Sequence, residues 1–353
     1  MFRITNVISV GLVSMVIANF AHAQSSVTLY GNMDTGLYYQ SKTAGNGGKM
    51  YSALDGGSFP SFWGMTGKED LGGGLHMGFK IESGIDTTNG GFGNSNGNLF
   101  GRQAYLEFGG GFGRIRAGLQ FSPFFVTNNI NGDPRGGLNN GGILPIYVNG
   151  FNGISGIFDS NAVEYLSPTV GGFSASIEFA PGGVAGSFQD NQRISASLNY
   201  QGASFGADVA YYQARDNGAG FVSLRGKTAD LKYTLGPVKL TAQATNYQNN
   251  APGVNTDDYV YDAGLIWNVT PALSLNGAYY YVYDKAHKPN QSSVVAVGAN
   301  YSLSARTTLY AQAAYVENRG TMGTGIAANA PGQIMGLPQG GTTGVNIGIR
   351  HYF

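Results

Sequence analysis

Residues 238–245 read VKLTAQAT, so that each apolar side chain is followed by a polar one. The same alternation, with glycine at some polar positions, is found in RISASLNY (193–200), LHMGFKIE (75–82) and the C-terminal VNIGIRHYF (345–353). A period of two puts successive side chains on opposite faces of a β-strand. No stretch after residue 23 keeps the helical period of 3.6. The sequence therefore predicts an all-β chain whose strands have one apolar and one polar face.

Sixteen segments of this kind can be marked along the chain, and the links between them alternate between short turns and longer loops rich in Gly and Asn. An even strand number with tight turns at one rim and loops at the other is typical of a closed antiparallel outer-membrane barrel. The predicted strands are 26–40, 53–67, 74–86, 98–109, 112–120, 161–167, 172–180, 191–201, 204–214, 225–235, 237–248, 257–268, 272–284, 292–301, 305–317 and 342–353.

The composition favours a membrane barrel over other β-rich classes. The chain has 57 Gly, 22 Tyr and 20 Phe but only 11% charged residues. This many aromatic residues argues against disorder, and a water-filled barrel in lipid needs apolar side chains on its outer face rather than long apolar runs. A soluble sandwich could share the alternation but would mix short and long links. A β-solenoid would show a fixed repeat, and none is present.

The first residues are predicted to be an export signal rather than part of the fold. Arg3 provides a short basic region, residues 7–20 are apolar, and Ala21-His22-Ala23 is a small-x-small cleavage site. We expect residues 1–23 to be removed and residues 24–353 to form one barrel domain. The apolar stretch is short for a spanning helix that stays attached.

Charge and motifs argue against other functions. Twenty basic residues balance twenty acidic ones, which does not favour a nucleic-acid partner. Residues 226–228 (GKT) resemble the end of a phosphate-binding loop, but Phe221 occupies the place of its first glycine. No motif groups His76, His287 and His351. We expect no enzymatic activity, cofactor or bound metal.

Four segments resemble the trimeric porins of Gram-negative bacteria: SSVTLYGNMDTGLYY (25–39), SFWGMTGKEDLGGGLHMGFKIESG (61–84), LFGRQAYLEFGGGFGRIRAGLQ (99–120) and GIRHYF (348–353). They occur in the family's order along the whole mature chain. The resemblance implies a 16-stranded barrel in the outer membrane, a homotrimer, and a long third loop, here 121–160, folded into the lumen. It also implies that Phe353 is the signal read by the barrel-assembly machinery, and that membrane lipid and lipopolysaccharide are partners.

The resemblance also implies candidates for the pore constriction. Arg102 matches one of the basic wall positions of the family, and Asp133 is a plausible acid of the third loop. Asn32, Phe62 and Asp159 stand where family members often carry Lys or Arg. This departure predicts weak ion selectivity that drifts toward cations.

Four further charges, Lys80, Glu82, Arg114 and Arg116, fall on the polar phase of their strands and are candidates to line the pore. Aromatic residues near strand ends fit the girdles that lie at the level of the lipid headgroups. These are Trp63, Tyr259, Tyr261, Trp267, Tyr279 and Tyr281.

The expected function is passive diffusion of small hydrophilic solutes and ions through a porin. A substrate-selective channel, with Phe62 and other aromatics forming a stacking path, is the alternative. An enzymatic barrel that acts on lipid is a third possibility without a recognisable catalytic set. Competitive block of conductance by one solute would separate the second function from the first.

Overall fold

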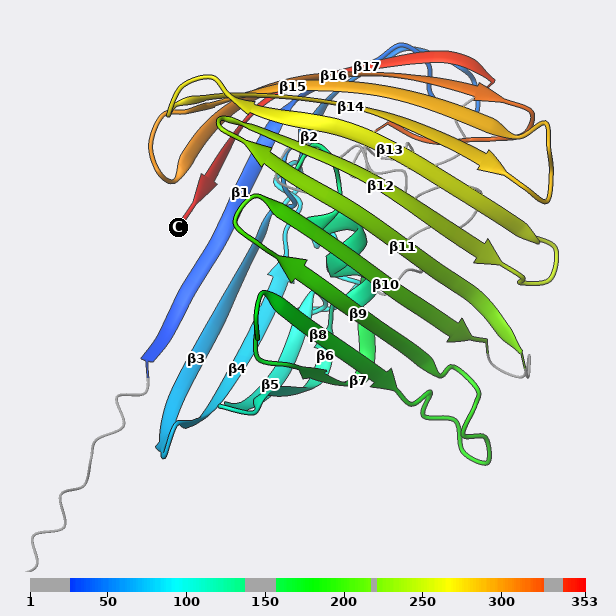
Figure 1. Cartoon of the computed structure of the whole chain (residues 1–353). Coiled ribbons are helices and arrows are strands. Elements are labelled where there is room, and N and C mark those ends of the chain that lie inside the picture. The colour runs from blue at the N-terminus through cyan, green and yellow to red at the C-terminus, as the bar shows by residue number, and fades with distance from the viewer. Residues whose placement is uncertain (1–25, 137–156, 217–220, 327–338) are drawn as a thin grey trace, which may run out of the picture.

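A computed structural model of the chain describes residues 26–136, 157–216, 221–326 and 339–353. The described residues form one antiparallel sheet of seventeen named strands and a short helical segment inside it (Figure 1). The strands are β1 (Ser26–Gln40), β2 (Met50–Asp55), β3 (Phe62–Gly72), β4 (Leu75–Gly84), β5 (Gln103–Gly110), β6 (Gly113–Gln120), β7 (Asp159–Leu166), β8 (Phe173–Ala180), β9 (Arg193–Gln201), β10 (Phe205–Arg215), β11 (Val222–Leu235), β12 (Val238–Asn249), β13 (Thr256–Asn268), β14 (Leu273–Asp284), β15 (Gln291–Ser302), β16 (Thr307–Arg319) and β17 (Gly340–Tyr352).

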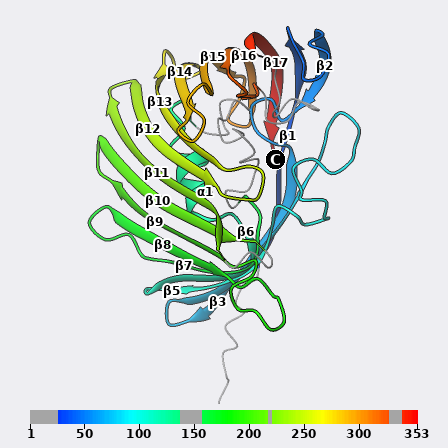
Figure 2. The ribbon, with the colours of Figure 1, turned by 90° about the vertical axis from the view of Figure 1, so that its right-hand side faces the viewer.

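The sheet closes on itself because β17 pairs with β1, from Asn32 opposite Tyr352 to Gln40 opposite Gly344. β2 and β3 both pair with β1, one after the other along its length, so they occupy one position in the ring. The predicted barrel of sixteen antiparallel strands is thus confirmed. Figure 2 shows the strands curving around the segment that contains the helical turn.

One predicted strand is wrong. The segment 53–67 was expected to be continuous, but it stops at Asp55 and resumes at Phe62. The Asp34 carboxylate accepts hydrogen bonds from the main-chain amides of Ser58 (3.0 Å) and Phe59 (2.8 Å), which draws this segment out of the ladder. A proline at position 60, which has no amide to donate to a neighbouring strand, also disfavours pairing.

The alternation of the sequence corresponds to the two faces of the wall. In β12 the side chain of Leu240 is 43% exposed on the outer face, whereas that of Thr241 is 4% exposed on the inner face. In β17, Ile347 is exposed and Asn346 is buried. Because lipid and water solvate the two faces, apolar side chains are stable outside and polar side chains inside.

The described residues contain no helix that is long and apolar enough to cross a membrane. The predicted signal segment 1–23 and the expected mature N-terminus, Gln24, lie outside the described residues. The link between the predicted strands 53–67 and 74–86 is shorter than expected, because β3 continues to Gly72 and β4 begins at Leu75.

Candidate pore constriction

The first part of the third loop enters the barrel as a short helical segment. Ser122 caps it, since its Oγ accepts a hydrogen bond from the amide of Phe125 (3.1 Å), and Pro123 occupies the first helical position. The helical turn α1 (Pro123–Phe125) continues into the π-helical turn η1 (Val126–Asn131). Residues 121–136 belong to the predicted loop 121–160, whose residues 137–156 lie outside the described part of the chain.

Apolar packing attaches this segment to the inner wall. The ring of Phe124 is fully buried, and its centroid lies 6.1 Å from the rings of both Tyr212 and Tyr247. Gly226 lies beneath it, and a Cβ atom at that position would come within 2.5 Å of Phe124 Cζ. The glycine therefore makes room for the ring on a strand that otherwise follows the alternation.

A hydrogen-bond network fixes the next turn of the segment. Asn128 Nδ2 donates to the hydroxyl oxygens of Thr245 (2.7 Å) and Thr228 (3.2 Å), and its Oδ1 accepts from the Tyr247 hydroxyl (2.6 Å). The main-chain carbonyl of Asn128 accepts from Gln243 Nε2 (3.0 Å). One residue thus joins the loop to β11 and β12 by four hydrogen bonds.

Asp133 follows η1 and contacts a more distant part of the wall. Its Oδ1 accepts from the Tyr280 hydroxyl (2.8 Å) and from the main-chain amide of Arg135 (2.9 Å). Burial raises the pKa of Asp133, although the Arg135 amide and charge and the Tyr280 hydroxyl each lower it. Arg135 itself donates to Asn276 Oδ1 (2.9 Å) on β14 and to Gln312 Oε1 (3.0 Å) on β16.

Arg102 is held between aromatic rings and a carboxylate rather than standing alone. Its guanidinium lies 4.9 Å from the ring centroid of Phe62 and 5.7 Å from that of Phe121, and its Nε is 3.5 Å from Glu82 Oε2. Glu82 also pairs with Lys80 at 2.8 Å. The side chain of Arg102 is 4% exposed, so its charge acts mainly on Glu82.

The structure brings Arg102 and Phe62 together and pairs Asn32 with Phe62 between β1 and β3, but it places Asp159 elsewhere. Asp159, at the start of β7, accepts from the Tyr212 hydroxyl (3.1 Å) and lies 3.5 Å from Arg193 Nε. Asn32 is fully buried, and its Nδ2 donates to the carbonyls of residues 59 and 60 (3.1 Å each).

The predicted pore-lining arginines are on the inner phase and are paired. Arg116 Nε lies 2.7 Å from Glu107 Oε2, and its Nη1 lies 3.7 Å from Glu164 Oε2. Arg114 is 3.6 Å from Glu107, but 44% of its side chain is exposed. Both arginines line a recess of about 250 Å³ between the start of the third loop and the wall.

The last residue closes the barrel at the turn side. The amide of Phe353 donates to the carbonyl of Gly31 (3.1 Å), and the Gly31 amide donates back (3.2 Å). A Cβ atom on Gly31 would come within 2.3 Å of the Phe353 ring.

Among the described residues, no group of three or more His, Cys, Asp or Glu side chains is arranged to hold a metal ion.

Sequence reasoning missed the residues that attach the third loop. Asn128 and Arg135 lie in a loop without a motif. A signal was present on the wall, however: Tyr247 and Tyr280 are large rings on the inward, mostly polar phase of their strands, and both are buried. Such breaks in the alternation mark the places where the loop packs.

Comparisons with known proteins agree with this architecture. The sequence profile of the Gram-negative porin family matches residues 10–321. Outer membrane porin protein 32 of Delftia acidovorans is 30% identical over 98% of this chain and 99% of its own length. The major outer membrane protein P.IB of Neisseria gonorrhoeae is 29% identical over 84% of this chain and 89% of its own. An anion-selective porin from Comamonas acidovorans, 25% identical, has a TM-score of 0.70 over 94% of this chain and 100% of its own. These matches confirm the resemblance drawn from the sequence: the chain belongs to the Gram-negative porin family of the outer membrane.

Proposed function

We propose that this porin is a passive diffusion channel for small hydrophilic solutes and ions, in which charged side chains are mostly neutralised by partners on the same wall. The observation that carries this proposal is the closed barrel with a polar inner face, to which residues 121–136 are attached. Such a pore needs no reaction. Its width sets the size limit, and its unpaired charges set the ion preference.

Weak ion selectivity follows from the pairing of the candidate charges. Arg102 faces Glu82, Asp159 faces Arg193, and Arg116 faces Glu107. The attraction and the repulsion that the two members of each pair exert on a permeating ion then nearly cancel. Opposite charges 4 Å apart interact by about 4 kcal/mol at an effective dielectric constant of 20, so the loss of one partner should produce a measurable preference.

Reversal potentials in a salt gradient test this proposal. Arg102→Ala removes one of the two cations that pair with Glu82, so the potential should move toward cation preference. Phe62→Arg should move it toward anions. The double variant Arg102→Ala/Glu82→Gln is the matched control, because it removes both charges and should return close to the wild-type value. Three unchanged potentials at low salt would show that this cluster does not act on the permeating ions.

The structure gives no specific support to a substrate-selective channel with an aromatic path. One face of the Phe62 ring is covered by the Arg102 guanidinium, and the side chain is buried. The family and the fold are those of a channel rather than an enzyme.

We further propose that the protein is a homotrimer in contact with membrane lipid and lipopolysaccharide. Large apolar side chains on the outer face near the barrel closure support it: Leu37 of β1 and Ile347 of β17 are paired in register and are 74% and 60% exposed. A trimer that migrates intact in detergent and dissociates on heating is expected. Migration as a monomer in mild detergent without heating would contradict the trimer.

Recognition of Phe353 by the barrel-assembly machinery is part of the same proposal. Deletion of Phe353 should reduce folded protein in the outer membrane far more than it changes the conductance of the channels that do form. Mutual hydrogen bonds with Gly31 give this residue a second role in closing the barrel. Phe353→Tyr, which keeps an aromatic ring and both main-chain hydrogen bonds, is the control and should assemble much better than the deletion. Wild-type amounts of folded protein after the deletion would contradict the proposal.

A further inference from the structure

Two cations lie on the outer face of the barrel, where lipid is expected. In β11 the residues Thr228 and Asp230 are buried on the inner face, so Arg225 and Lys227 share the outward phase with Ala229. Lys227 is exposed and Arg225 is partly exposed. Neither forms an ion pair with another described residue.

The neighbours of these cations on the outer face are polar. Lys227 is opposite Tyr211 on β10 and Asn246 on β12, and Arg225 is opposite Gln213 and Gln248. The hydrogen-bonded row of Arg225 continues through Gln248 to an acidic residue, Asp257 on β13. Asp257 is two strands from Arg225 and thus about 10 Å away. Its carboxylate accepts hydrogen bonds from Asn246 Nδ2 (2.7 Å) and Gln248 Nε2 (3.3 Å), so it is engaged with the amides between the strands.

Lys227 lies beside aromatic residues on the outer face toward the loop side, and its direct partner on β10 is Tyr211. The row that contains Lys227 continues through Asn246 to Tyr259 and Tyr283, whose rings stack at 5.3 Å. Tyrosine rings on the outside of a membrane barrel lie at the headgroup level. In bacterial outer-membrane barrels the rim with the longer loops faces the cell surface. Lys227 and Arg225 therefore face the headgroups of the outer leaflet.

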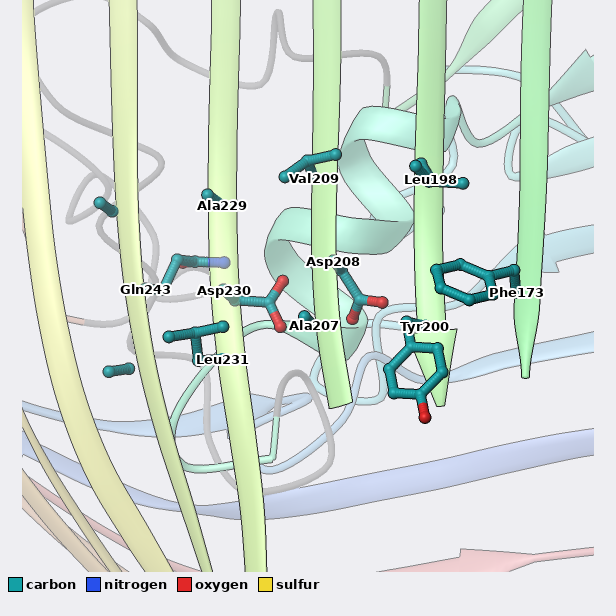
Figure 3. A pocket seen from close by; sticks show the side chains of 12 residues that line it. Phe173, Leu198, Tyr200, Ala207, Asp208, Val209, Ala229, Asp230, Leu231 and Gln243 are labelled. Atoms are coloured by element: carbon teal, nitrogen blue, oxygen red, sulfur yellow. The ribbon is translucent and has the colours of Figure 1, made fainter. Parts of the chain in front are cut away.

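An apolar groove begins directly below the two cations. Ala229 is the next outward residue after Lys227, roughly 6–7 Å further along β11. With Ala207, Ala242 and Ala244 it lines a depression of about 560 Å³, which we call the alanine groove. Larger side chains around it include Leu198, Val209 and Leu231, and Phe173 and Tyr200 lie at its turn-side end (Figure 3).

We propose that this surface binds lipopolysaccharide, the phosphorylated glycolipid of the outer leaflet, with a phosphate on Arg225 and Lys227 and an acyl chain in the alanine groove. A hollow in a lipid-facing wall loses dispersion contacts unless a chain fills it. Cations near lipid are stabilised by anionic headgroups, and Arg and Lys both bind phosphate. This inference deepens the proposed lipopolysaccharide contact by giving it a place on the barrel.

The test uses purified full-length protein stripped of lipid and titrated with purified lipopolysaccharide, with bound copies counted by native mass spectrometry. Arg225→Gln/Lys227→Gln should lower the affinity at least tenfold. Ala229→Leu, which fills the groove without changing charge, should also lower it. Arg306→Gln is the charge control, because Arg306 lies in the turn between β15 and β16 at the opposite rim, and it should bind like the wild type.

The outcomes separate the site from the broader proposal. If the wild type binds lipopolysaccharide and the double variant binds it equally well, the site is wrong but the lipid contact stands. If the wild type binds none, both are wrong, while the channel function is unaffected. Equal binding of phosphatidylglycerol, with the same loss in the double variant, would overturn the choice of lipopolysaccharide. Loss of binding after removal of the lipid A phosphates would support it.

Discussion

Attachment of the third loop through Asn128 can be tested by a single truncation. Asn128→Ala removes three side-chain hydrogen bonds, to Thr228, Thr245 and Tyr247. The two threonines still bond each other (2.9 Å), but the buried Tyr247 hydroxyl loses its hydrogen bond to Asn128. At about 1 kcal/mol net per hydrogen bond, the loss is about 3 kcal/mol. The ratio of attached to detached loop should then fall by a factor on the order of 100.

Single-channel recording in planar bilayers measures this change directly. Asn128→Ala should increase the current noise of the open level and the frequency of transitions between conductance levels. Asn129→Ala is a matched control, because Asn129 is equally buried, at 4%, and its Nδ2 has no hydrogen-bond partner among the described residues. Tyr247→Phe combined with Asn128→Ala should add little to the single change, since both remove the same contact. Identical noise in Asn128→Ala, Asn129→Ala and wild type would refute the reasoning.

Three further outcomes follow from the same geometry. Asp133 has a raised pKa in the folded protein, so its ionised form destabilises the attachment. This loss of stability should be absent well below the ordinary Asp value of about 3.9, grow as pH rises from that value to the raised pKa, and stay constant above it. Asp133→Asn should therefore melt higher than wild type at neutral pH and equal to it near pH 3; a difference independent of pH would contradict this. Gly226→Ala should displace the Phe124 ring and raise the current noise. Gly277→Ala should not, because the nearest atom to its new Cβ would be 3.6 Å away. Equal noise in the two variants would contradict the close packing of Phe124 on Gly226. Glu82→Gln should lower the unfolding temperature in detergent, because a buried Arg102 charge without its carboxylate costs about 3 kcal/mol. The same change at exposed Glu69 should have little effect. Equal unfolding temperatures of the two variants would argue against a stabilising Arg102–Glu82 pair.

The barrel could be predicted from the sequence because its two solvents impose a local rule. Lipid outside and water inside select alternate side chains at every step, as in Leu240 and Thr241 of β12. The break after Asp55 could not be predicted in this way. It depends on Asp34, which is distant in sequence and captures two main-chain amides from the segment.

The candidate site was only partly accessible to the same reasoning. Arg102 and Glu82 were both singled out, but their pairing joins two strands and is not visible in either. Arg135 was missed because a loop residue, unlike a strand residue, does not follow an alternation that tells which way its side chain points. Its partners Asn276 and Gln312 also lie far along the chain. Tyr280 could have been noticed as a ring on the polar phase of β14.

The most direct test of the channel function is the permeation of neutral sugars of increasing size into liposomes that contain the purified protein. Passive diffusion through a water-filled pore gives rates that fall steadily with solute size and rise linearly with concentration. We expect this behaviour, with no solute able to block the others competitively. A rate that saturates for one solute class, together with competitive block by that class, would contradict the account and establish a substrate-selective channel.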